Sequence, residues 1–260
     1  MKQYVVDAFT DKVFGGNPAA ICILDAWPSD RLLMQIALEN NLSETAYAVQ
    51  TGDSWHLRWF ALNGEIDLCG HATMAAAYTI MEYITPGVSQ VRFDTMSGRI
   101  TVDKKDGRYA INFPAYTLRQ IPVTEDMTKA IGVRPAEAYM GRDLVCLLDK
   151  EEDVYSASPD LEKVKALDGL LLHITAKGTE YDCVSRTFAP KCNTPEDPVC
   201  GSGHCHLIPL WAEKLSVSAL TAYQASRRGG VIYATMLGQR VQLAGNAVLF
   251  SIDEIFLPEE

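Results

Sequence analysis

The chain has 260 residues, of which 48% are hydrophobic and 22% charged, and its formal net charge is −10 at pH 7. That composition is ordinary for a globular protein, and the length allows one large domain or two small ones. The acidic excess disfavours a nucleic-acid partner or an anionic membrane partner. No apolar run approaches the roughly 18 residues of a membrane-spanning helix.

The first residues, "MKQYVVDAFT", lack the apolar stretch and small-residue cleavage site of a secretory signal. Seven cysteines, an odd number in a chain too large to need disulfides, indicate mostly reduced thiols. We therefore expect a cytoplasmic protein.

The first half of the sequence predicts strands around two helices. Ser29 is the expected N-cap of the first helix, whose apolar residues Leu32, Leu33, Ile36 and Ala37 have helical spacing. The alanine-rich "HATMAAAYTIMEYI" predicts the second helix, and "NGEIDLCG" before it is expected to be a loop. The expected strands are "YVVDAF", the end of "VFGGNPAAICIL", "ETAYAVQ", "SWHLRWF", "VRFDT" and a hairpin "RITVDKKDGRYAINF" with an Asp-Gly turn.

The second half predicts a similar order. "LEKVKAL" and "HCHLIPLWAEKL" are expected helices, the latter kinked or restarted at Pro209. "PKCNTPEDPVCGSG" is expected to be a loop. The expected strands are "GLLLHITA", "YDCVSRTFA", "LTAYQAS", a hairpin in "VIYATMLGQRVQLAG" and a last strand "NAVLFSI".

Placing the two halves side by side indicates an internal repeat. In each half an Arg-x-Phe-Ala strand end precedes an acidic loop and then a Cys-Gly helix start, at Cys69 and at Cys200. Pro114 and the stretch to about Thr128 mark the boundary. We expect two copies of one α+β unit, with the two helix starts facing each other across a cleft, where small ligands usually bind.

Such helix starts suit a carboxylate ligand, because their free N–H groups and positive dipole end attract anions. Gly70 and Gly201 let a ligand approach the backbone closely. A thiol at a helix start can have a pKa of roughly 3.5–7.5. Cys69 and Cys200 together could therefore form a two-base racemase or epimerase site. Alternatively, both are small buried residues.

A zinc site is a weaker interpretation. Zinc-ligand residue types gather near the second helix start, but their spacing fits no compact site, and neighbouring helical residues point about 100° apart. These candidate ligands are Cys192, Cys200, His204, Cys205 and His206. We therefore predict no metal, and no dinucleotide fingerprint is present.

Together, and in this order, several motifs resemble the phenazine-biosynthesis isomerase (PhzF-like) family, within the diaminopimelate epimerase and proline racemase fold group. The motifs are "VDAFT", "GGNPAA", "LSETAY", "DLCGHAT", "EDPVCGSGHC", "LIPLW" and "QASRRGG". The resemblance implies an α+β fold of two pseudo-symmetric domains, each a mostly antiparallel, barrel-like sheet wrapped around a central helix. It places the first repeat at residues 1–115, with the last strand, about 246–260, returning to it, and the second at 116–245.

The resemblance also implies roles for individual residues. It implies that Glu44 of "LSETAY" is the catalytic acid and base, and that His71 and Asp197 are its partners. Its substrate-binding positions fall on Asn17, Gly70, Gly201 and Ser202. Both thiol positions are Cys here, as in the epimerases and racemases, so the two-thiol alternative stays open. His56 and His173 are expected to be structural.

We therefore expect a cofactor-independent isomerase that moves a proton on a small carboxylate-bearing metabolite, with Glu44 as acid and base. One alternative is a two-thiol epimerase or racemase of an amino or imino acid that uses Cys69 and Cys200. Another is a non-catalytic carboxylate-binding protein. The resemblance allows a homodimer, which no residue pattern indicates.

Overall fold

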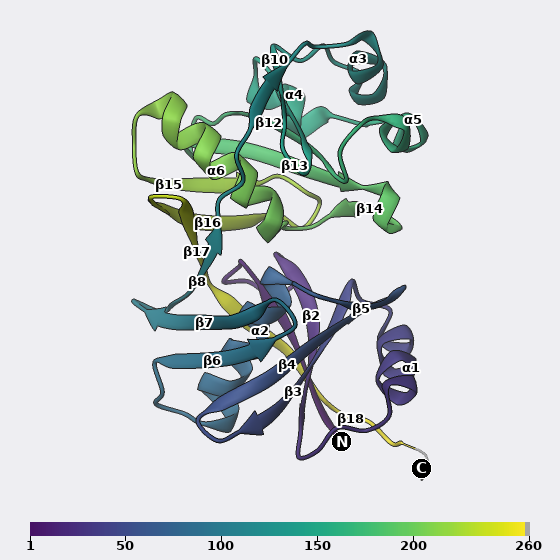
Figure 1. Cartoon of the computed structure of the whole chain (residues 1–260), viewed down its shortest axis with the longest axis vertical. Helices are drawn as coiled ribbons and strands as arrows, with labels where there is room; N and C mark the ends of the chain where they lie inside the picture. The colour runs from purple at the N-terminus through teal and green to yellow at the C-terminus, as the bar shows by residue number, and fades with distance from the viewer. Residues whose placement is uncertain (258–260) are drawn as a thin grey trace. The chain divides into compact units, whose positions relative to one another are not determined.

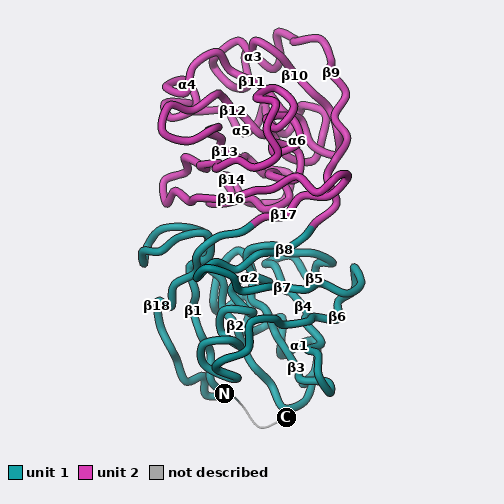
Figure 2. Tube along the Cα trace, turned by 90° about the vertical axis from the view of Figure 1, so that its left-hand side faces the viewer, with its two compact units in different colours: residues 1–112, 244–260 teal, residues 113–243 magenta. Residues whose placement is uncertain are grey.

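The computed structural model describes residues 1–257. Contacts divide the chain into two compact units, of which unit 1 comprises residues 1–112 with the segment from 244 onward, and unit 2 comprises residues 113–243 (Figure 2). Within the described residues, no helix combines the length and apolarity that crossing a bilayer requires.

Unit 1 is a sheet with two helices (Figure 1). The helices are α1 (Asp30–Asn40) and α2 (Gly70–Thr79), the latter continued by the π-helix η1 (Ile80–Ile84). The strands are β1 (Lys2–Ala8), β2 (Asn17–Leu24), β3 (Glu44–Thr51), β4 (Ser54–Ala61), β5 (Gly64–Ile66), β6 (Gln90–Thr95), β7 (Gly98–Lys105), β8 (Arg108–Pro114) and β18 (Ala247–Glu254).

The strands of unit 1 pair in the order β18–β1–β2–β3–β4–β6–β7–β8. The β2–β3 and β4–β6 pairs are parallel and the others antiparallel, while β5 pairs with the end of β4. At the β7–β8 turn both Asp106 and Gly107 have positive φ (51° and 77°), as an Asp-Gly hairpin turn requires.

Unit 2 contains the remaining elements. Its helices are α3 (Glu125–Ile131), α4 (Glu151–Ser156), α5 (Leu161–Ala166), the short 3₁₀ turn η2 (Pro190–Cys192) and α6 (Gly201–Leu215). Its strands are β9 (Arg119–Ile121), β10 (Glu137–Met140), β11 (Leu144–Leu147), β12 (Leu172–Lys177), β13 (Cys183–Ala189), β14 (Thr194–Asp197), β15 (Ala219–Gln224), β16 (Gly230–Leu237) and β17 (Arg240–Gly245), whose last residues belong to unit 1.

The pairing in unit 2 repeats that of unit 1. Its strands pair in the order β9–β10–β11–β12–β13–β15–β16, and the β11–β12 and β13–β15 pairs are parallel. The short β14 pairs with the end of β13, as β5 does with β4. The predicted repeat is therefore confirmed strand by strand, with α6 following β14 as α2 follows β5.

The central helix of each unit is buried. In α2, eight of the ten residues are buried, and the helix packs against β1, β2, β3, β7 and β18. A helix that is apolar on all sides belongs in the interior, and its run of alanines lets strands approach closely. In unit 2, α6 has ten buried residues, packs against β15 and β16, and remains one helix through Pro209.

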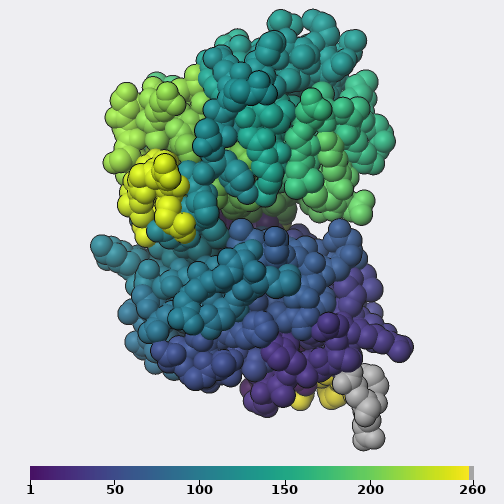
Figure 3. Space-filling model, viewed as in Figure 1, coloured from purple at the N-terminus to yellow at the C-terminus, as the bar shows by residue number. Residues whose placement is uncertain are grey.

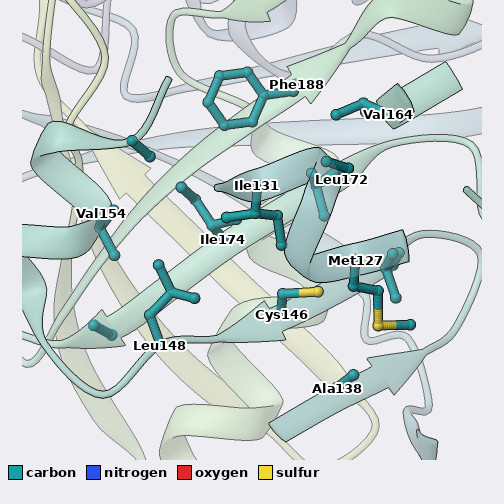
Figure 4. Close-up of a cluster of buried hydrophobic side chains, with 14 of the residues drawn as sticks. Met127, Ile131, Ala138, Cys146, Leu148, Val154, Val164, Leu172, Ile174 and Phe188 are labelled. Carbon is teal, nitrogen blue, oxygen red and sulfur yellow. The ribbon is translucent and has the colours of Figure 1, made fainter. Parts of the chain in front are cut away.

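Other helices cover the outer faces of the sheets. Ser29 caps α1 through its side chain, as predicted, and the helix lies at the surface of unit 1 (Figures 1 and 3). Its buried side chains pack on Tyr47 and Phe60. In unit 2, side chains of α3, α4 and α5 pack onto β11, β12 and β13 (Figure 4).

Two expected loops contain short strands. Residues 64–66 form β5 and residues 194–197 form β14. Both are anchored by an arginine, because Arg58 on β4 makes a two-bond ion pair with Glu65, and Arg186 on β13 makes the same pair with Glu196. These side-chain contacts between neighbouring strands do not show in a local hydrophobic pattern.

The close packing of α2 leads to a stability prediction. Ala76 is fully buried, so Ala76→Leu adds volume that the surrounding strands cannot accommodate without strain. We expect this change to lower the free energy of unfolding by roughly 1–3 kcal/mol, measured by urea denaturation. Gln35→Leu on the exposed face of α1 is the matched control and should change it by less than about 0.5 kcal/mol. Equal stability of the two variants would contradict the packing described here.

Candidate active site

Glu44 and His71 form a buried acid–base pair in unit 1. Glu44 is the first residue of β3, and His71 is the second residue of α2. Their side chains are 17% and 7% exposed, and Oε2 of Glu44 lies 3.1 Å from Nε2 of His71. The structure thus brings together two residues that are distant in sequence and that were both expected in the site.

Asn17 fixes the other side of the imidazole. It begins β2, is fully buried, and its Nδ2 lies 3.2 Å from Nδ1 of His71. The Asn17 amide meets Nδ1 on one side of the ring and the Glu44 carboxylate faces Nε2 on the other, so the imidazole is held from both sides. Asn17 therefore orients the histidine, and the substrate contact that the sequence resemblance implied for it stays a prediction.

Charge stabilises the protonated form of His71. Burial by itself lowers the pKa of His71, but interactions with Cys69 and then with Glu44 raise it well above the ordinary value. A histidine that holds its proton at neutral pH can stabilise a carboxylate or an oxyanion beside it.

The two cysteines occupy matching places. Cys69 is the N-cap of α2 and Cys200 is the N-cap of α6. The Cys200 sulfur accepts a hydrogen bond from Gly203 N at 3.3 Å, whereas the Cys69 sulfur lies 3.5 Å from Nδ1 of His71. Both cysteines are N-caps of the central helices, as their predicted equivalence requires.

Burial opposes ionisation of both thiols. Desolvation raises the pKa of Cys69, and the charge of Glu44 adds to the effect. Desolvation also raises the pKa of Cys200 well above its usual value, with a further contribution from Asp197. A helix start would lower these pKa values, but here the loss of solvation dominates.

Asp197 and Ser202 flank Cys200 in unit 2. Oδ1 of Asp197 accepts a hydrogen bond from Val199 N at 3.1 Å, closing a small turn around Pro198. Ser202 Oγ lies 3.4 Å from the Cys200 sulfur. Asp197 thus shapes the approach to α6, while the N-cap itself is Cys200. Gly70 and Gly201 are the first residues of the two central helices.

The proposed zinc ligands serve other purposes. Nδ1 of His204 and Nδ1 of His206 each bond to the carbonyl one turn earlier, at Cys200 and Ser202. Burial lowers the pKa of each of these histidines to about 4, and Cys192 is exposed. Within residues 1–257 the groups with ligand atoms close enough for an ion are different ones: Glu44 with Cys69 and His71, and Asp143 with His173 and His206.

Sequence reasoning missed a polar cluster in unit 2. Asp143 is fully buried and takes two hydrogen bonds from Arg142, at 3.0 and 2.6 Å, and one from His173 at 3.1 Å. Burial by itself raises the pKa of Asp143, but these hydrogen bonds outweigh it and hold the pKa well below the ordinary range. An Arg-Asp dipeptide before an apolar strand was the available signal. It carries little information without knowledge of burial.

The repeat does not duplicate the acid–base pair. Thr45 pairs with Phe60 in unit 1 as Leu172 pairs with Phe188 in unit 2. Glu44 therefore corresponds to Leu171, which packs on Ala189 and Cys200. Among these site residues the helix-cap cysteines recur, whereas the residue equivalent to Glu44 is apolar, so the acid–base pair is a feature of unit 1.

Comparisons with known proteins agree with this class of site. An uncharacterized isomerase of Pseudomonas aeruginosa is 43% identical over 259 residues, covering 99% of each chain. The crystal structure of a PhzF-family phenazine biosynthesis protein from Enterococcus faecalis has a TM-score of 0.97 at 44% identity, covering 98% of this chain and 99% of that one. A hydroxyproline epimerase from Agrobacterium vitis, 11% identical, shares the fold with a TM-score of 0.64 and coverage of 97% and 91%.

These findings define the protein as an isomerase with the α+β fold of the epimerases and racemases, as the sequence predicted. The family described as phenazine biosynthesis-like protein matches residues 6–252, and the chain belongs to that family.

The pair of Glu44 and His71 predicts a measurable titration shift. Because the Glu44 charge raises the pKa of His71, Glu44→Gln should lower that pKa, as followed by the proton NMR signals of the histidine ring. Glu65→Gln, which removes a carboxylate paired with Arg58 in the same unit, should leave it unchanged. An unaltered His71 titration in Glu44→Gln would contradict the charge coupling.

The same coupling makes the stability of the protein depend on pH in a predictable direction. A group whose pKa is raised on folding stabilises the folded protein. This contribution is complete at pH values below the unfolded pKa of about 6.5, and it is lost as the pH rises through the folded pKa. Glu44→Gln should therefore reduce stability at mildly acidic pH and change it less at alkaline pH, as measured by denaturation at both.

Burial of the thiols predicts their order of alkylation. The buried Cys69 and Cys200 have raised pKa values, whereas Cys192 is exposed. With iodoacetamide at pH 7.5 and peptide mass mapping, Cys192 should be modified first, with Cys69 and Cys200 protected. Modification of the two helix-cap thiols as fast as Cys192 would show that they are accessible thiolates.

Proposed function

We propose that this protein is a cofactor-independent isomerase that moves a proton between two carbons of a small carboxylate-bearing metabolite. The observation that carries this proposal is the buried contact between Glu44 and His71, 3.1 Å apart. A carboxylate that lies against an imidazole and is largely removed from water is suited to take up and return a proton.

The proposed step balances without any redox partner. A substrate C–H bond breaks, its proton passes to a Glu44 carboxylate oxygen, and the electron pair spreads into the conjugated carboxylate as an enol-like anion. A new C–H bond then forms at a second carbon with the proton that Glu44 returns. The positive charge of His71 favours the state in which negative charge has moved onto the substrate.

The remaining residues are proposed to bind and orient the substrate. Asn17 holds His71 in one orientation, through the contact of 3.2 Å. Asp197 is proposed to stabilise the intermediate. The amides of Gly70 and Gly201 and the hydroxyl of Ser202 are proposed carboxylate donors, since each lies at the start of a helix.

A two-thiol epimerase is the second candidate. The matching cap positions of Cys69 and Cys200 favour it, while the raised pKa of each thiol opposes it. A thiol near its ordinary pKa or above it is a poor base at neutral pH. Replacing each cysteine by serine tests it, because retained activity in both variants excludes this mechanism.

Incorporation of solvent deuterium tests the proposed mechanism directly. The protein is incubated in D₂O with a panel of cyclic imino acids, α-amino acids and unsaturated ring carboxylates, and C–D formation is followed by NMR and mass spectrometry. For a compound that the wild type exchanges, Glu44→Gln should slow exchange by about 10²–10⁴-fold, with Glu65→Gln as the control. Unchanged exchange in Glu44→Gln excludes Glu44 as the base. A ligand that binds without exchange would favour a binding protein.

A further inference from the structure

The Arg142 cluster of unit 2, defined as Arg142, Asp143, His173, His206 and Tyr116, joins three buried polar side chains to a partly exposed arginine and tyrosine. Besides the bonds from Arg142 and His173, Asp143 accepts one from Leu171 N at 3.4 Å. Asp143, His173 and His206 have fully buried side chains. The Tyr116 ring stacks on His206 at 4.0 Å and 8°, so the cluster is rigid.

The repeated scaffold does not need this cluster. By strand register and by distance from the N-cap, its three buried members correspond to three fully buried alanines of unit 1. The equivalent pairs are Asp143 with Ala19, His173 with Ala46, and His206 with Ala75. Because an ion pair is costly to bury and alanine fills the same place in unit 1, stability does not explain the cluster.

The cluster holds one partly exposed group in a fixed place. The Arg142 side chain is 36% exposed, and its guanidinium lies 5.1 Å from the centre of the Tyr116 ring. Two of its nitrogens are fixed by Asp143. The same Nη2 that bonds to Asp143 also donates to Ser202 Oγ at 3.0 Å. The buried Asp143 carboxylate therefore holds Arg142 in the orientation in which it donates to Ser202.

The hydrogen-bond donors and acceptors available at this contact determine the role of Ser202. Arginine has no acceptor, so Ser202 Oγ must accept from Arg142, and its own hydrogen must be donated elsewhere. The nearby Cys200 sulfur, at 3.4 Å, is a weak acceptor. A carboxylate oxygen would be a much stronger one. Ser202 is also the second residue after its N-cap, as His71 is in unit 1.

We propose that Arg142 is the positioning residue that makes the Ser202 hydroxyl a hydrogen-bond donor to a carboxylate oxygen of the substrate. This inference rests on the proposed function, in which Ser202 contacts the substrate carboxylate. Since Asp143 neutralises Arg142, the arginine acts through the direction of its hydrogen bond and through Ser202. Ligands with a planar carboxylate are selected over their uncharged amides.

The test uses pyrrole-2-carboxylate and pyrrole-2-carboxamide as probes, with binding followed through the backbone amide NMR signals of Gly201 and Ser202. It is carried out in the Glu44→Gln protein, so that loss of the proposed catalytic base and loss of carboxylate binding are separate results. We expect the carboxylate to bind and shift these signals, and the carboxamide to bind at least about tenfold more weakly, the loss expected for a hydrogen bond to a charged group.

Two changes isolate the role of Arg142. Arg142→Lys keeps the charge and loses the planar geometry, and Arg142→Gln with Asp143→Asn removes both charges so that no buried carboxylate is left unpaired. Each should weaken carboxylate binding by about tenfold or more. Adding either change to Ser202→Ala should have little further effect, because the arginine acts through the serine. Arg134→Gln removes an exposed arginine of unit 2 and should leave binding unchanged.

Three outcomes would overturn the proposal. They are failure of the carboxylate to bind the Glu44→Gln protein, equal binding of acid and amide, and losses for Arg142 and Ser202 changes that simply add. Additive losses would mean that Arg142 only supports the local structure. None of these outcomes bears on whether Glu44 carries the proton, which the deuterium experiment decides separately.

Discussion

The beginning of the central helix in unit 1 imposes the constraint on which the rest of the site depends. The sheet surrounds α2 so completely that the first turn of the helix is withdrawn from water. Burying polar side chains is costly unless they lie against other polar groups, and at this turn they do so. Asn17 from β2 and Glu44 from β3 contact His71 there, at 3.2 and 3.1 Å, which places a carboxylate directly beside an imidazole.

The two units show how one scaffold can carry two different polar arrangements. Strand order, parallel pairs, helix caps and the arginine–glutamate anchors recur in both. The buried polar residues do not recur. Unit 1 has alanines where unit 2 has the Arg142 cluster, and unit 2 has Leu171 where unit 1 has Glu44. Equivalent positions therefore hold apolar residues in one unit and polar residues in the other, so each unit places charge at a different position beside its central helix.

Burial affects both chemistries that the sequence left open. The same N-terminal helix turn can activate a thiol through its dipole or disable it through desolvation, and the balance depends on exposure. Here both helix-cap thiols are buried and have raised pKa values. The carboxylate of Glu44, in contrast, has a histidine whose raised pKa keeps a positive charge beside it. The chain belongs to the phenazine biosynthesis-like family, and relatives of it are named isomerases.

The sequence by itself determined the features that local patterns encode. Ser29 caps its helix, the Asp106–Gly107 turn has positive φ, and the Arg-x-Phe-Ala and Cys-Gly repeats mark two equivalent units with their central helices. It also singled out Glu44 and His71 through motifs. Only the tertiary structure decided how far each group is removed from water and which distant residues it meets. Thiol ionisation, the contact of Asn17 with His71 and the Arg142 cluster depend on the sheet closing around a helix, and so on pairings between residues far apart in the chain. No local spacing specifies such pairings.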